Sequence, residues 1–195
     1  MKVFILYFCL CISLGSYAQK KYEREYRINA SEVPQQALDF IAAFNIDKRI
    51  KWYQEQGLNV TSVEAKFKLK GEKYSIEFSD DGALEDIEQN VSFNSLEETI
   101  QEKIKSYLKE HYDAFNIEKV QRQYTGDPDV LIAWRQTADF PTLDTEHKNI
   151  TQIYELIVRT RTESKVLLFE FQFDKNGQKI EKKEIITRDT DILRF

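Results

Sequence analysis

The chain has 195 residues, enough for one large domain or two small ones. Its 33 acidic and 28 basic side chains give a formal net charge of −5, which argues against a nucleic-acid-binding or anionic-membrane surface. Two histidines and two cysteines offer few groups for nucleophilic catalysis or for binding a transition metal.

Residues 1–18 have the pattern of a secretory signal peptide. Lys2 gives a positive start, an apolar run follows from Val3 to Leu14, and Ser16-Tyr17-Ala18 is typical of a signal-peptidase site. This run is shorter than the about 20 residues of a membrane-spanning helix. Both cysteines lie inside it, so the mature chain would form no disulfide. We expect a periplasmic or secreted bacterial protein without stable membrane insertion after cleavage.

A first unit is predicted for residues 31–92, after a charged N-terminal segment at 19–30. A helix is predicted to begin at Ser31, because serine is a favoured N-cap and apolar residues recur at helical spacing up to Phe44. Asp81-Gly82 is typical of a hairpin turn. Alternating apolar and polar residues predict four antiparallel strands, within 50–53, 63–69, 74–78 and 84–89.

A second unit is predicted for residues 93–195 in the same order. Ser95 is predicted to cap its helix, with Glu98 completing a capping box. An insertion at 125–149 distinguishes this unit from the first, and Val130–Trp134 within it is predicted to add a strand. We expect the protein's own binding specificity to lie in this insertion. The other strands are predicted within 117–124, 154–161, 166–174 and 180–186.

The two units repeat one pattern. The stretch Tyr74–Gly82 is echoed by Phe169–Gly177, and each stretch ends in a turn of Asp or Asn followed by Gly. An internal repeat indicates one folding unit used twice. The predicted fold class is therefore α+β, with two tandem α-β4 units, each an antiparallel sheet with one helix packed on one face.

Two motifs carry a resemblance to a known family. They are Val33-Pro34-Gln-Gln-Ala37-Leu-Asp-Phe40 and Tyr74-Ser-Ile76-Glu-Phe78-Ser-Asp-Asp81-Gly82-Ala-Leu84. Together they resemble the PepSY-like, beta-lactamase-inhibitor-like secreted proteins, well over residues 31–89 and more loosely over 95–186. The resemblance implies a tandem α-β4 fold whose open sheet face holds a protein partner. In the inhibitors of this family such a concave face grips an enzyme.

The sequence contains no recognisable catalytic constellation. His111 lies on the apolar stripe of the second helix and His147 in a polar loop, and neither has a partner at metal-ligand spacing. There is no glycine-rich phosphate loop and no EF-hand order. We expect no enzymatic activity, cofactor or metal. A hydrolase with paired carboxylates is the least favoured alternative.

The outer-facing positions of the predicted strands suggest a binding surface. Lys66 and Lys68 form part of a basic ridge, which is either a solvated strand face or a surface that meets an acidic partner. Exposed aromatic residues among charges are typical of protein interfaces. We expect an exported, non-enzymatic module that binds a protein or peptide through the exposed sheet face, with an inhibitor-like role as its more specific form. The alternative is an envelope protein that binds a small ligand or ion between the two units. The candidate partner-binding residues are Tyr53, Lys66, Lys68, Glu77, Tyr124, Trp134 and Arg159.

Overall fold

The structure, a computed structural model, describes residues 19–21, 24–46, 48–57, 60–137, 148–163 and 165–186. The predicted signal peptide, His147 and most of the polar loop of the predicted insertion lie outside these residues. The described strands are β1 (Gln19–Lys21), β2 (Arg24–Ile28), β3 (Lys51–Gln56), β4 (Thr61–Leu69), β5 (Glu72–Ser79), β6 (Leu84–Asn90), β7 (Ala114–Gly126), β8 (Ile150–Thr162), β9 (Lys165–Asp174) and β10 (Lys179–Ile185). The α-helices are α1 (Gln35–Ala43), α2 (Glu98–His111) and α3 (Pro128–Thr137).

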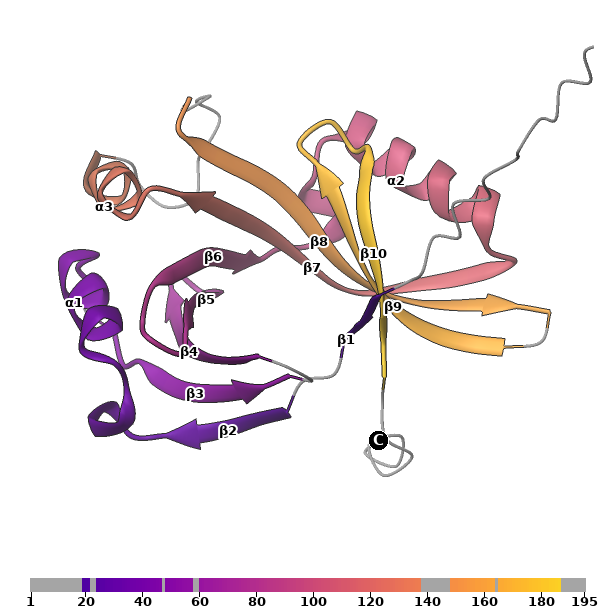
Figure 1. The fold of residues 1–195 in the computed structure, drawn as a ribbon. Coiled ribbons are helices and arrows are strands. Elements are labelled where there is room, and N and C mark those ends of the chain that lie inside the picture. Colours follow the sequence, from indigo (N-terminus) through magenta and orange to yellow (C-terminus); the bar gives the residue numbers. More distant parts are fainter. Residues whose placement is uncertain are drawn as a thin grey trace, which may run out of the picture.

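All the described strands belong to one sheet, in the order β1-β10-β9-β8-β7-β6-β5-β4-β3-β2 (Figure 1). The prediction of two tandem units with a sheet each is wrong. Strand β6 pairs with β7, from Ile87 opposite Tyr124 to Asn90 opposite Gln121, and this pairing joins the two halves. An unpaired strand edge exposes backbone hydrogen-bonding groups, and pairing the two edges satisfies them. The alternative prediction placed a small-ligand site between two separate units. The described strands of both halves instead belong to one shared sheet.

Strands β1 and β2 are consecutive in the chain but lie at opposite edges of the sheet. β1 pairs in parallel with β10, whereas β2 pairs antiparallel with β3. Residues 22 and 23 alone separate the two strands. Successive Cα atoms are about 3.8 Å apart, so the Cα atoms of Lys21 and Arg24 lie within about 11 Å. The two edges therefore come close together, and the sheet curls, with α1 and α2 on its outer side (Figure 1).

Two apolar cores cover the outer face of the sheet. The first lies between α1 and strands β3–β6, and two residues of α3 complete it. The second lies between α2 and strands β7–β9. Alternation along each strand sends apolar side chains to this face and polar ones to the inner face. Fully buried members include Ala37, Ile76, Phe78 and Leu131 in the first core and Ile104, Leu108, Leu156 and Phe171 in the second.

Both predicted helices, α1 and α2, begin later than predicted. Ser31 lies inside a 3-10 turn, and α1 begins at Gln35. Ser95 likewise ends a 3-10 turn, and α2 begins at Glu98. Neither serine is the N-cap of an α-helix. In each case a residue that packs into the core lies between the 3-10 turn and the start of the helix. These buried residues are Val33 and Leu96.

The strand predicted at Val130–Trp134 is a helix instead. Asp127 Oδ1 accepts hydrogen bonds from the backbone N–H groups of the two residues after Pro128, at 2.9 and 3.4 Å. A carboxylate in this position caps a helix, and proline suits the first turn. Leu131 and Trp134 are three residues apart and therefore share one helical face, which packs into the first core.

Candidate functional site: the inner face of the sheet

The inner face is the side of the curled sheet opposite the three helices. It carries the polar positions of each strand, and register places Tyr53 opposite Glu64, Glu64 opposite Glu77, and Glu77 opposite Asp86. Several of these charged side chains are buried although they do not belong to an apolar core. The buried carboxylates of this face are Glu55, Glu64, Asp86, Glu88, Glu155 and Glu170.

A basic pocket of about 520 Å³ opens on this face. Its lining includes one carboxylate, Glu64, against seven cationic side chains, a formal charge of +6. Tyr53 contributes an aromatic side chain from the inner face, whereas the rings of the other two aromatic lining residues, Phe67 and Tyr74, stack at 5.5 Å in the first core. The size is typical of a ligand site. We call it the basic pocket, and its cations are Lys48, Arg49, Lys51, Lys66, Lys68, Lys73 and Lys119.

Lys66 is held in place at the floor of the basic pocket. Its Nζ lies 2.8 Å from Glu64 Oε2 and 2.8 Å from Glu25 Oε1, and 5.1 Å from the centre of the Tyr53 ring. Burial lowers the pKa of Lys66, but the charges of Glu64 and Glu25 and hydrogen bonds to both raise it by more, so the pKa lies above its usual range. Lys66 therefore stays charged and ties β2 to β4.

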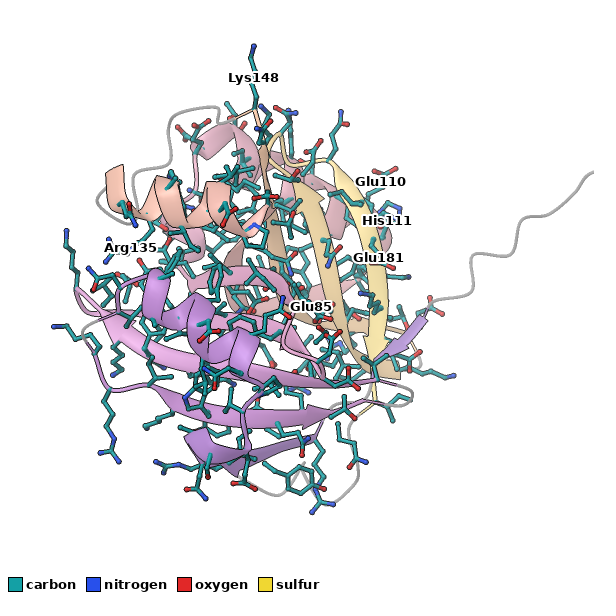
Figure 2. All side chains as sticks on the ribbon, turned by 60° about the vertical axis from the view of Figure 1, so that its left-hand side comes forward. Glu85, Glu110, His111, Arg135, Lys148 and Glu181 are labelled. Atoms are coloured by element: carbon teal, nitrogen blue, oxygen red, sulfur yellow. The ribbon has the colours of Figure 1, made fainter. Side chains whose placement is uncertain are left out.

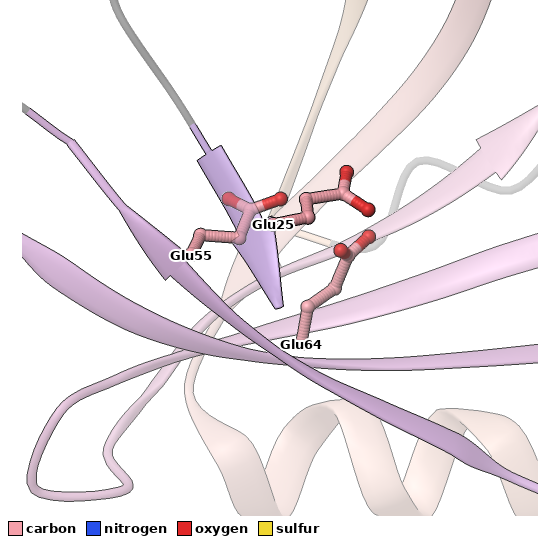
Figure 3. Close-up of side chains that lie close together, drawn as sticks. All are labelled: Glu25, Glu55 and Glu64. Carbon is pink, nitrogen blue, oxygen red and sulfur yellow. The ribbon is translucent and has the colours of Figure 1, made fainter. Parts of the chain in front are cut away.

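Glu25, Glu55 and Glu64 point toward one another from three neighbouring strands (Figure 3). One carboxylate oxygen of each lies within 4.8 Å of the others. Carboxylate oxygens suit hard cations such as Ca²⁺ or Mg²⁺. Here Lys66 already supplies positive charge to two of the three, which accounts for their close approach.

Glu77, Asp86 and Glu88 form a second carboxylate triad, also with one oxygen each within 4.8 Å. Amide groups of the neighbouring strand β7 face it. Gln123 Nε2 donates to Asp86 Oδ2 at 2.7 Å, and Gln121 Nε2 donates to Glu88 Oε2. Among the described residues, Asp86 Oδ1 has no hydrogen-bond partner. The side chains of Gln121 and Gln123 thus donate hydrogen bonds to this second triad, and its three carboxylates lie close together.

Protonation relieves this crowding. Burial, followed by the charges of Glu88 and Glu155, raises the pKa of Asp86 to about 8. Burial, followed by the charges of Asp86 and Glu88, raises the pKa of Glu77 well above its ordinary value. Groups this close titrate as a unit. The triad therefore binds a proton more readily than isolated carboxylates do.

Three of the predicted partner-binding residues come together: Tyr53, Lys66 and Lys68 line the basic pocket. Glu77 belongs to the neighbouring triad. Arg159 lies at another part of the sheet, where its Nε is 2.5 Å from Glu118 Oε1. Whether these residues bind a partner stays a prediction.

Tyr124 and Trp134 are not surface residues. Their side chains are 1% and 5% exposed, and their rings pack at 5.6 Å within the first core. The expectation of exposed aromatic groups is wrong for this pair. α3 folds back from the second half of the chain and places Trp134 over the first core, so this part of the predicted insertion has a packing role.

His111 lies away from the inner face. His111 is exposed at the end of α2, where its Nδ1 lies 2.8 Å from the Tyr107 carbonyl oxygen and its ring stacks on Tyr107 at 4.3 Å (Figure 2). This is a helix-end packing arrangement. No helix in the described part of the chain is both long and apolar enough to cross a membrane.

The sequence interpretation missed several lining residues of the basic pocket. Lys73 could have been predicted from the sequence, because the hairpin turn at Lys70-Gly71 brings it opposite Lys68. Lys119 and Gln121 were not, because they reach the pocket through the pairing of β6 with β7, which no local signal specifies.

Solved structures with a similar fold exist at low sequence identity. A DUF2874-family protein from Bacteroides ovatus ATCC 8483 matches with a TM-score of 0.50 and 13% identity, over 78% of this chain and 87% of that one. A BLIP-like protein from Bacteroides fragilis NCTC 9343 matches with a TM-score of 0.46 and 14% identity, over 80% of this chain and 89% of that one. No protein-family model and no curated protein matches the sequence. The first similarity shows a shared fold, and membership of the PepSY-like family stays a prediction.

Proposed function

We propose that this protein is a non-enzymatic binding module that recognises a protein partner through the inner face of its sheet. The observation that carries this proposal is the basic pocket, in which seven cations gather on the face opposite the helices. Charged groups fixed in a concave surface give a protein interface its specificity and steer the approach of the partner.

The inner face also has the rigidity that recognition requires. The carboxylates around the pocket are held by Lys66 and by amide groups of β7, and each side chain projects from a paired strand. Groups that are ordered before binding lose less conformational entropy when the partner arrives. We extend the proposal to a protein exported through the signal peptide predicted at residues 1–18. Inhibition of an enzyme is its most specific form.

Site-specific photo-crosslinking tests the proposal. A benzophenone amino acid replaces Lys68, on the inner face, or Gln54, whose side chain is exposed on the outer face of β3. Each variant is produced in its native cells, irradiated and analysed by mass spectrometry. We expect a defined protein adduct from position 68 and none from position 54. Equal labelling at both positions, or no adduct from position 68, contradicts the proposal.

A further inference from the structure

We infer that the basic pocket binds an acidic segment of a protein partner, with several Asp or Glu side chains placed against its lysines. This inference rests on the proposed function and adds the chemistry of the partner.

The charge of the pocket opposes that of the protein as a whole. The chain carries a formal charge of −5, whereas the pocket lining carries +6. A concave surface lined by one sign of charge concentrates the field and draws in the opposite charge. Negative charge elsewhere on the protein repels an acidic partner, so this pocket is where such a partner can dock.

Strand register places like charges directly opposite each other in the pocket. Lys51 lies opposite Lys66, and Lys68 lies opposite Lys73. Like charges at paired positions destabilise a sheet. Within the described part of the chain Lys66 has carboxylate partners, whereas no carboxylate pairs with Lys51, Lys68 or Lys73. Carboxylates from a partner would relieve this repulsion, which makes acidic groups the matching ligand.

The layout favours a short segment over a single anion. The cations come from β3, β4, β5 and β7 and from the residues before β3. Neighbouring strands are about 4.8 Å apart, so β3 and β7 are separated by about 19 Å along the sheet. One phosphate or carboxylate group is too small to contact them together, whereas a segment with several acidic side chains can do so.

The surroundings of the basic pocket suit a short acidic segment better than a long polyanion. From Glu64 in the pocket, a row of acidic residues continues through Glu77 on β5 to Asp86 on β6. A long polyanion would extend beyond the lysines onto this row, which offers it no positive charge. The ring of Tyr53 also lines the pocket from the inner face, which suits a peptide with its mixture of charged and apolar groups.

Fluorescence anisotropy tests the inference with the full-length protein. The probe is a fluorescein-labelled Gly-Ser peptide containing six glutamates, and the matched probe contains six glutamines. The test variant is Lys68→Glu/Lys73→Glu. The control is Lys165→Glu/Lys179→Glu, which changes the charge equally at exposed positions outside the pocket. Circular dichroism checks that both fold.

We expect the glutamate peptide to bind, and its Kd to rise at least about tenfold in the test variant with little change in the control, since the contact is electrostatic. Raising the salt from about 50 to about 300 mM should also weaken it. Binding of both peptides alike, equal loss in the two variants, or stronger binding of inorganic phosphate or a short DNA duplex overturns the inference. A partner that crosslinks at position 68 without glutamate-peptide binding would leave the proposed function standing and remove the inference alone.

Discussion

A Cβ atom built on Gly82 would lie 2.8 Å from Cβ of Pro34, closer than non-bonded carbon atoms approach. Gly82 closes the β5–β6 hairpin with a φ of +92°, and Pro34 immediately precedes α1. The hairpin turn therefore rests directly on the start of the helix. The β9–β10 turn does the same, because a Cβ on Gly177 would lie 3.3 Å from Lys103 Cβ and 3.4 Å from Ile100 Cα of α2.

Gly82→Ala should therefore destabilise the protein more than Gly71→Ala. Both glycines have positive φ, +92° and +91°, but a Cβ on Gly71 would meet nothing within 4 Å. The left-handed backbone costs each alanine about 1 kcal/mol, and overpacking adds about 1–3 kcal/mol for Gly82→Ala alone. Urea unfolding measures both. Equal losses would mean that the hairpin does not press on α1.

Trp134→Ala should lower the free energy of unfolding by about 3–5 kcal/mol, the usual cost of deleting a buried aromatic side chain. Trp134→Phe should cost less, because it keeps a ring against Tyr124. Denaturant unfolding gives both values. If Trp134→Ala left stability unchanged but abolished crosslinking to a partner, Trp134 would belong to the binding surface and not to the core.

Local patterns predicted the strands better than their assembly. The hairpin of β4 and β5 follows from alternation and Gly71, and it correctly places Lys66 and Lys68 on one face. Tyr124 was harder to place. It shares the outer face with buried Val120, but Arg122 between them breaks the apolar pattern.

Long-range pairing and capping account for the errors. No local sequence pattern indicates which strand pairs with β6. The sequence therefore predicted two sheets where the structure has one. The strand predicted at Val130–Trp134 overlooked Asp127 and Pro128, which together are typical of a helix start. Only part of the basic pocket could be predicted for the same reason. Its residues on β3–β5 follow from local strand patterns, whereas its residues on β7 depend on the pairing that joins the two halves of the sheet.

Asp86→Asn should flatten the dependence of stability on pH. The pKa of Asp86 is raised in the folded state to about 8, so the folded protein binds its proton more tightly than the unfolded chain does. This contribution is complete below the unfolded pKa near 4 and is lost as pH rises to about 8. Between these two pKa values unfolding releases one proton, so the free energy of unfolding falls by about 1.4 kcal/mol per pH unit.

We expect Asp86→Asn to raise Tm relative to the wild type, and to raise it more at pH 8 than at pH 5. Thermal unfolding between pH 4 and 9 measures this. Glu72→Gln, at an exposed position of β5, serves as the control and should follow the wild type. An identical gain at pH 5 and pH 8 would contradict a proton-binding triad.

Lys66→Met should cost about 1–3 kcal/mol, because it leaves the buried Glu64 carboxylate without its nearest cation. Lys68→Met, two residues along the same face and exposed, should stay within about 0.5 kcal/mol of the wild type. Adding Glu64→Gln to Lys66→Met should restore part of the loss. Chemical denaturation of the four proteins tests this, and equal effects at positions 66 and 68 would argue against the pair.

The parallel pairing of Gln19–Lys21 with Lys183–Ile185 joins the first described strand to the last. Contacts between such distant parts of a chain carry the largest loop-closure cost and form after local hairpins. We therefore expect this pairing to form late in folding, after the hairpins of the sheet. Slow amide exchange at its backbone would mark molecules whose folding is complete, and early exchange there would report the first opening of the sheet.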